Sequence, residues 1–174
     1  MPKFYLKLAK EAVERYIKKG EIISPFNNLP KEALTKKSGA FVTIMENGNL
    51  RGCIGTYLPT KNNIAEEIIY NAVAAATEDY RFEPIQNKEI SSLSYSVYIL
   101  SEPELVKDLK ELDPKKYGII VKTGHFTSKT GLLLPDLEGV DTIEQQISIT
   151  CQKGGIDPLR GNILIYKFTA EKFQ

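Results

Sequence analysis

Residues 47–57 read N-G-N-L-R-G-C-I-G-T-Y, and the expected fold of the first half of the chain follows from this stretch. The dipeptide Asn47-Gly48 is suited to the positive φ angles of a tight hairpin turn. Residues 40–45 before it are apolar and rich in β-forming types, and residues 50–56 after it carry spaced apolar side chains. The pattern predicts an antiparallel β-hairpin whose second strand spans residues 50–56.

Two glycines lie inside this second strand, where glycine costs backbone entropy and offers no side chain for packing. Regular alternation along the strand would place Arg51, Cys53 and Gly55 on one face. We expect Gly52 and Gly55 to clear space around the thiol, so that an approaching backbone or ligand can reach it.

Two interpretations of Cys53 remain open. In the first, the glycines mark a bulge and Cys53 is a small packed residue, since free cysteine is among the most buried residue types. In the second, Cys53 is a reactive or ligand-contacting thiol, and the guanidinium of Arg51 favours its thiolate form. The exposure of the thiol decides between the two.

The string L-R-G-C-I-G-T at residues 50–56 closely resembles the hallmark motif of the AMMECR family, whose bacterial and archaeal members are called AmmeMemoRadiSam system protein A. Two more stretches resemble the same family, D-Y-R-F-E-P at residues 79–84 and G-L-L-L-P-D-L-E-G-V-D-T at residues 131–142. The resemblance implies one AMMECR-like domain over residues 1–174, with a larger and a smaller lobe and the cysteine motif near the cleft between them. It also implies Memo-like and radical SAM proteins as partners.

The rest of the chain mixes helical and strand periodicities and predicts an α+β fold with a largely antiparallel sheet and packed helices. Helices are expected at residues 6–17 and 64–76 and from Thr142 to Gly154, strands at 93–99, 118–122, 126–134 and finally 161–168, and a long loop at 25–37. Asn63 with Glu66, and Thr142 with Gln145, have the spacing of helix capping boxes. Cys151 shares the apolar face of the last helix, so we expect it to be buried.

Composition limits the classes of function. The chain has 174 residues, enough for one domain, with 42% hydrophobic and 26% charged residues. Its net charge of +1 provides no overall field for nucleic acid or an anionic membrane, and no apolar run approaches the roughly 20 residues that span a bilayer. Two cysteines and a charged N-terminal segment without a signal-peptide pattern indicate the cytoplasm.

Other chemistry has less support in the sequence. His125 is the single histidine, so a Cys53–His125 pair would have to use it, and a zinc site has too few ligands among Cys53, Cys151 and His125. Residues 128–130, S-K-T, lack the glycine loop of a phosphate-binding motif. The amides of Gly52 and Gly55, together with Arg51 and Thr56, could still bind a small anion.

The two other family-like stretches each have two interpretations. Arg81 either pairs with Asp79 or Glu78 in a structural corner, with Phe82 as a plug, or adds a second positive charge to the site around Cys53. The carboxylates of residues 136–141, Asp136 among them, either belong to loop and helix-terminus structure or line the same cleft as Arg51.

Two hypotheses for function follow. One is an enzyme or enzyme component in which Cys53 and Arg51 act in a cleft on a small anionic substrate, which Gly52, Gly55, Thr56, Arg81 and Asp136 help to bind. The other is a non-catalytic module that uses the same motif to bind a Memo-like or radical SAM protein. The sequence names no cofactor and no metal.

Overall fold

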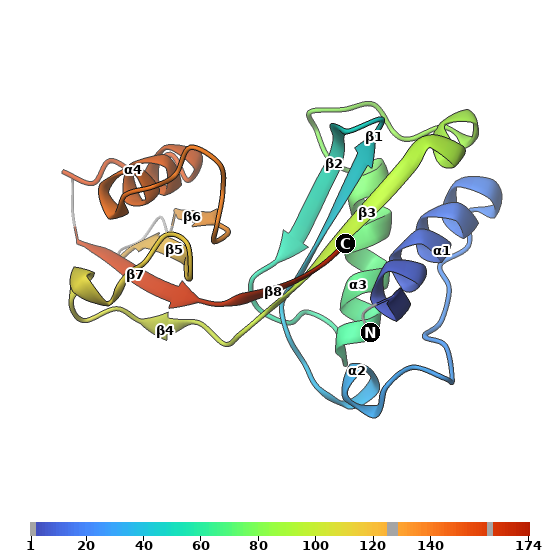
Figure 1. Ribbon diagram of the computed structural model, residues 1–174, viewed down its shortest axis with the longest axis horizontal. Helices are drawn as coiled ribbons and strands as arrows, with labels where there is room; N and C mark the ends of the chain where they lie inside the picture. Colours follow the sequence, from blue (N-terminus) through green and yellow to red (C-terminus); the bar gives the residue numbers. More distant parts are fainter. Residues whose placement is uncertain (1–2, 125–128, 160–161) are drawn as a thin grey trace. The chain divides into compact units, whose positions relative to one another are not determined.

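The computed structural model describes residues 3–124, 129–159 and 162–174, and the chain forms two compact units (Figure 1). The first unit comprises the chain up to Leu100 together with Glu171–Gln174, and the second comprises Ser101–Ala170. Each unit contains its own four-stranded sheet. The α+β class with antiparallel sheets and packed helices is as predicted, but the strands divide between two sheets instead of one.

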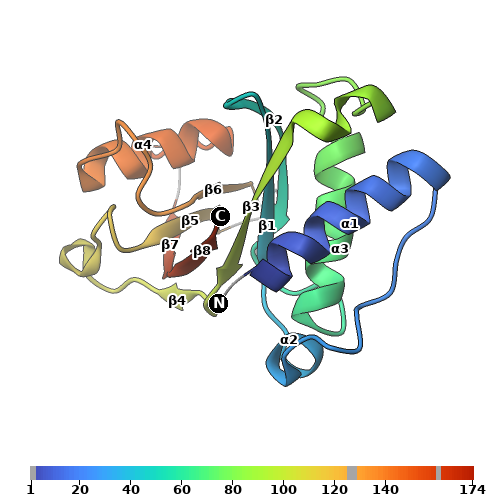
Figure 2. The same cartoon turned by 45° about the vertical axis from the view of Figure 1, so that its right-hand side comes forward.

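The first unit is a sheet with two long helices on one face (Figures 1 and 2). Its strand order is β2-β1-β3-β8, and β1 pairs antiparallel with both β2 and β3. The elements are α1 (Lys3–Lys19), α2 (Lys31–Thr35), β1 (Ala40–Glu46), β2 (Asn49–Thr56), α3 (Ile64–Thr77), the 3-10 turn η1 (Asn87–Ser92), β3 (Leu93–Leu100) and β8 (Ala170–Phe173). Because β1 and β3 are internal, β2 is an edge strand.

The predicted hairpin is confirmed. Asn47 and Gly48 have φ angles of 49° and 83°, and they form the turn between β1 and β2. The pairing is regular from Ala40 opposite Thr56 to Ile44 opposite Gly52, but Met45 then pairs with Leu50. This shift leaves one extra residue, Arg51, on β2. The strand therefore contains a β-bulge, which re-aims the side chain at that position.

The core of the first unit lies between the sheet and helices α1 and α3. Ten of the 14 residues of α3 are buried, and the predicted cap at Asn63 accepts a hydrogen bond from the Glu66 backbone N–H. Small residues let the helix approach the sheet closely. A Cβ added at Gly52 would lie 2.0 Å from the Ala75 carbonyl oxygen, so β2 and α3 meet backbone to backbone at this point.

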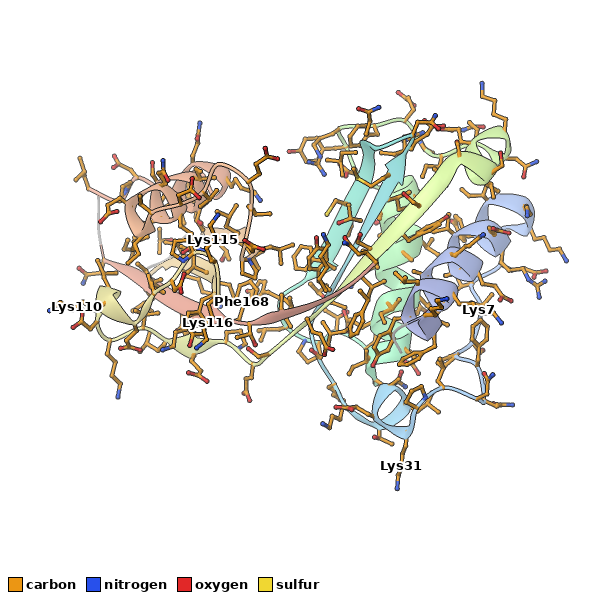
Figure 3. The ribbon with its side chains drawn as sticks, viewed as in Figure 1. Lys7, Lys31, Lys110, Lys115, Lys116 and Phe168 are labelled. Carbon is orange, nitrogen blue, oxygen red and sulfur yellow. The ribbon has the colours of Figure 1, made fainter. Side chains whose placement is uncertain are left out.

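The second unit has strand order β4-β7-β5-β6, with helix α4 against β5 and β6. Its elements are β4 (Glu104–Leu105), η2 (Leu109–Glu111), β5 (Gly118–Thr123), β6 (Thr130–Leu133), α4 (Ile143–Lys153) and β7 (Ile163–Phe168). The capping box of Thr142 and Gln145 is present, and Cys151 is buried as expected at 2% exposure. Phe168, labelled in Figure 3, is also 2% exposed.

Three details differ from the sequence prediction. The loop predicted at 25–37 contains the short helix α2, whose Lys31 extends outward in Figure 3, as Lys7 does from α1. The strand predicted at 161–168 is not the last one, because β8 follows it. The strand predicted at 126–134 is β6, which begins at Thr130, and Phe126 lies outside the described residues.

Candidate functional site

Cys53 lies on the edge strand β2, and both its backbone N–H and its thiol have interaction partners. Its backbone N–H donates to Oδ2 of Asp79 at 2.9 Å, away from the partner strand. Its Sγ lies 3.2 Å from Oγ1 of Thr43, the residue opposite on β1. The side chain points away from α3, since its neighbour Gly52 faces that helix. The thiol is free and half-buried, between the two extremes that the sequence left open.

Asp79 lies just beyond the end of α3, and it holds the edge of the sheet in place. Its carboxylate is 4% exposed and accepts hydrogen bonds from the Cys53 and Arg81 backbones and from Nε and Nη2 of Arg81, at 2.9 and 2.7 Å. The pKa of Asp79 is lowered from 3.8 to about 2, and the main cause is the hydrogen bond from the Arg81 side chain. Asp79 is therefore a charged, saturated acceptor at neutral pH.

Arg81 is linked to the Cys53 segment through Asp79, whose carboxylate accepts from both the Cys53 backbone and the Arg81 guanidinium. Its pKa is raised, mainly by the hydrogen bond to Asp79, and a Coulomb attraction to Cys53 adds to this effect. The side chain is 43% exposed, and its side-on bond to Asp79 leaves Nη1 without a partner among the described residues. Of the two interpretations of Arg81, the ion pair with Asp79 is present, and a role as a second positive charge at the Cys53 site stays a prediction.

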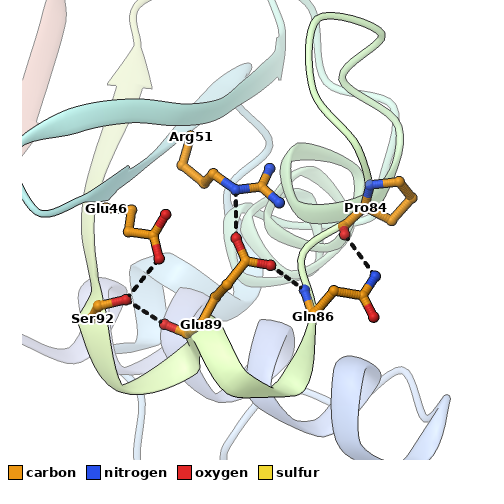
Figure 4. A network of polar contacts seen from close by, with 6 residues as sticks. All are labelled: Glu46, Arg51, Pro84, Gln86, Glu89 and Ser92. Carbon is orange, nitrogen blue, oxygen red and sulfur yellow. Dashed lines mark hydrogen bonds and ion pairs between the residues drawn. The ribbon is translucent and has the colours of Figure 1, made fainter.

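Arg51 is turned toward a different carboxylate. Its Nε donates to Oε1 of Glu89 at 2.7 Å, and Oε2 of Glu89 accepts from the Gln86 backbone N–H at 2.6 Å (Figure 4). The hydrogen bond from Arg51 is the main cause of a lowered pKa at Glu89. The bulge at Arg51 interrupts the regular alternation from which we expected Arg51 and Cys53 to share a face, so that expectation stays a prediction.

Phe82 connects the two arginines. The Cζ atom of Arg51 lies 5.9 Å from the centre of the Phe82 ring, and that of Arg81 lies 5.5 Å from it. Both distances are within the range of a cation–π attraction, which orients a guanidinium against a ring. The two ion pairs, Arg51–Glu89 and Asp79–Arg81, thus adjoin one aromatic side chain.

The two glycines do not open space around the thiol, so that expectation is wrong. A Cβ on Gly55 would lie 2.2 Å from the Phe41 ring, and Gly52 abuts Ala75. Thr56 is engaged as well, since its hydroxyl donates to the buried carboxylate of Glu67 and accepts from the Asn71 amide. Binding of a ligand by Gly52, Gly55 or Thr56 stays a prediction.

Asp136 belongs to the second unit. It is exposed, has a φ of 54°, and donates its backbone N–H to the Pro114 carbonyl. Asp141 nearby in sequence pairs with Lys115, which Figure 3 labels, at 2.8 Å on the surface. These contacts agree with loop and helix-terminus structure, and the role of Asp136 in substrate binding stays a prediction.

The described side chains outside the Cys53 region form no second candidate site for metal binding. Within residues 3–124, 129–159 and 162–174, no cluster of three or more histidine, cysteine, aspartate or glutamate side chains is placed to hold a metal ion. His125, and with it a Cys53–His125 pair, lies outside the described residues, as does Ser128. No helix in the described part of the chain is long and apolar enough to cross a membrane.

Comparison with known proteins decides the family. The model of the family described as AMMECR1 matches residues 6–173. The chain belongs to the AMMECR1 family. The family predicted from the motif around Cys53 is therefore confirmed, and the match includes both compact units.

AMMECR1 relatives share the whole length of the chain. A protein of Thermotoga maritima is 49% identical over 171 residues, which are 98% of this chain and 97% of that protein. A protein of Clostridium acetobutylicum is 44% identical over 97% of this chain, but the match spans only 34% of that longer protein. A crystal structure of a Pyrococcus horikoshii protein, 34% identical, superposes with a TM-score of 0.89 over 98% of this chain and 89% of its own.

Two carboxylates of this AMMECR1 site were not singled out as functional by the sequence. Asp79 was considered only as a partner of Arg81, and its bond to the Cys53 amide joins positions 26 apart. Glu89 was missed altogether. A local signal existed for Glu89, because it stands three residues after Gln86, and the two form a capping box at the start of η1.

Proposed function

We propose that this AMMECR1 protein is an enzyme, or an enzyme component, that binds a small anionic substrate beside the Cys53 thiol. The observation that carries the proposal is the Asp79 carboxylate, which binds the Cys53 backbone and the Arg81 guanidinium at once. One buried carboxylate thereby bonds both the backbone of Cys53 and a guanidinium. A guanidinium near a half-buried thiol favours the thiolate and offers hydrogen bonds to an anion.

In this proposal the two arginines have separate tasks. Arg81 supplies the charge next to Cys53, which the sequence had assigned to Arg51. Arg51 supplies a second group of N–H donors two positions away on the strand, about 7 Å along an extended chain. Cys53 is the group that reacts with or contacts the substrate, and Asp79 is a positioning residue.

The direct test is a screen of small carboxylates and phosphates by thermal shift on wild type, Cys53→Ser and Arg81→Gln. A ligand at 100 times its dissociation constant stabilises the protein by about 2.7 kcal/mol. We expect this stabilisation to be lost in both variants and retained in Glu83→Gln, which removes an exposed charge from the same segment. A ligand that stabilises all four proteins equally would exclude the Cys53 site.

A second measurement tests the thiol itself. Alkylation of Cys53 at neutral pH should slow in Arg81→Gln and recover in part in Arg81→Lys, because lysine restores the charge without the planar fork. Arg51→Gln should have the smaller effect, since Arg51 is paired with Glu89. Equal rates in wild type and Arg81→Gln would remove the electrostatic basis of the proposal.

A second candidate function is a protein-interaction module that acts with Memo-like and radical SAM proteins in the cytoplasm. It is favoured by the Clostridium acetobutylicum relative, in which the matching segment is 34% of a longer chain. Tyr80 supplies a contact residue, because it is 95% exposed between the two members of the Asp79–Arg81 pair. Titration calorimetry with purified Memo-like and radical SAM proteins discriminates the functions. The module predicts binding that Tyr80→Ala weakens and Cys53→Ser leaves unchanged.

A further inference from the structure

Arg51 presents one edge of its guanidinium to Glu89 and the other edge to solvent. Among the described residues, only Nε of Arg51 has a hydrogen-bond or ion-pair partner, and neither Nη atom makes such an interaction. The buried polar side-chain atoms that lack a partner in the described chain are Tyr95 Oη and Gln146 Oε1, so both Nη atoms of Arg51 reach solvent. Figure 4 draws a contact to Glu89 from Nε of Arg51 and none from its two terminal nitrogens.

This open edge is held rigidly. The Arg51 side chain is only 15% exposed and its partner Glu89 only 14%. The bulge at Arg51 turns the side chain toward η1, the Gln86 backbone fixes the Glu89 carboxylate, and the Phe82 ring lies beside the guanidinium. A pre-organised donor group loses little entropy when a ligand binds. Arg51 is thus a half-buried arginine whose unused N–H donors are positioned to bind a ligand.

The geometry of the guanidinium decides which anion fits this edge. The two ion pairs contribute two guanidinium ions, Arg51 and Arg81, and two carboxylates, Asp79 and Glu89, and Lys88 adds a positive charge that acts on Glu89. The Nη1–Nη2 edge offers two parallel N–H donors, which match the two oxygens of one carboxylate.

We infer that the substrate of the Cys53 site carries a carboxylate, and that the Nη1 and Nη2 atoms of Arg51 bind it bidentately. This inference rests on the proposed function and narrows its anion to a planar monoanion. Glu89 acts as the positioning residue, because its bond to Nε sets the plane of the guanidinium.

The test uses acetate and inorganic phosphate as probes, titrated into the full chain at constant ionic strength and followed by the Arg Nε and Nη NMR signals. Acetate should bind wild type more tightly than phosphate does, and should perturb the Arg51 signals first. Arg51→Lys keeps the charge but loses the planar fork, so its acetate dissociation constant should rise by about tenfold. Arg15→Lys is the matched control, since Arg15 is an exposed arginine paired with Glu21 in the same unit.

Glu89→Gln provides a second variant should Arg51→Lys fold poorly. It removes the ion pair that orients the guanidinium, and Coulomb attraction alone would then strengthen acetate binding, so weaker acetate binding identifies the orienting role of Glu89. Unchanged acetate affinity in both Arg51→Lys and Glu89→Gln, or tighter binding of phosphate than of acetate, would overturn the inference. Those results leave the role of Cys53 standing. Conversely, loss of the Cys53 and Arg81 effects on alkylation and ligand screening, with acetate still bound at Arg51, removes the proposed function and leaves the carboxylate site.

Discussion

Substitution of Asp79 by asparagine tests the arrangement on which the site depends. Asparagine has nearly the shape of the aspartate, but it is neutral and places an N–H₂ group where the carboxylate accepts from Arg81 or from the Cys53 amide. The variant therefore removes the ion pair with Arg81 and leaves the asparagine N–H₂ group facing an N–H donor of Arg81 or of the Cys53 backbone. Because Asp79 is 4% exposed, water does not replace the lost partner.

The size of the expected stability loss follows from the lowered pKa of Asp79. A fall from 3.8 to about 2, at about 1.36 kcal/mol per pKa unit, means that the charged form of Asp79 stabilises the fold by about 2 kcal/mol. The folded-state pKa is depressed, so this contribution is complete well above pH 3.8 and is lost as the pH falls toward about 2. Roughly half of it should remain at about pH 3.

The assay is urea denaturation of wild type and Asp79→Asn between pH 7 and pH 3, together with hydrogen exchange of the β1–β2 amides, which reports on the first unit by itself. The difference in unfolding free energy should be about 2 kcal/mol at pH 7 and should shrink by roughly half at pH 3. Glu83→Gln, an exposed carboxylate of the same segment, should show neither effect. A wild-type-to-variant difference that stays constant over this pH range would refute the reasoning, because the stabilisation would not come from the charge of Asp79.

Three further predictions concern the glycines and the cysteines. Gly52→Ala should lower the unfolding free energy by about 2–3 kcal/mol or more, since its Cβ would lie 2.0 Å from a backbone oxygen, and urea denaturation that finds less than about 0.5 kcal/mol would contradict the close packing. Gly48→Ala meets no atom within 4 Å but must keep a φ of 83°, so the same assay should give a loss of about 1 kcal/mol from backbone strain alone. In native-state labelling with a thiol reagent, Cys53 should react faster than Cys151, whose pKa is raised by burial, and the reverse order would mean that the two thiols have been assigned wrongly.

The parts of the fold that were predictable are those set by local chemistry. Asn47-Gly48 fixes the hairpin through its positive φ angles, and the caps at Asn63 and Thr142 fix two helix starts through hydrogen bonds within four residues. The burial of Cys151 follows from helical periodicity. Each of these features depends on neighbours in sequence, so the sequence alone contains the signal.

The parts that were not predictable depend on pairing between distant segments. A bulge in this strand was one of the two interpretations of its glycines, and it is present, but its position was not predictable, because no residue type marks Arg51 as the extra residue. The short strand β8 is two hydrophobic residues around Glu171 and Lys172, which is too weak a pattern to separate from a tail. The division of the strands into two sheets likewise follows from long-range pairing.

The candidate site shows why the motif alone does not identify the charged partner of Cys53. The motif places Arg51 two positions from Cys53, and regular alternation would have made that arginine the thiol's neighbour. Two carboxylates from outside the motif determine the contacts that form, because Glu89 binds Arg51 and Asp79 binds both the Cys53 amide and Arg81. Each guanidinium is therefore oriented by one carboxylate and retains unused donors. Whether these unused donors bind an anion beside the thiol is what the ligand screen and the alkylation experiment measure.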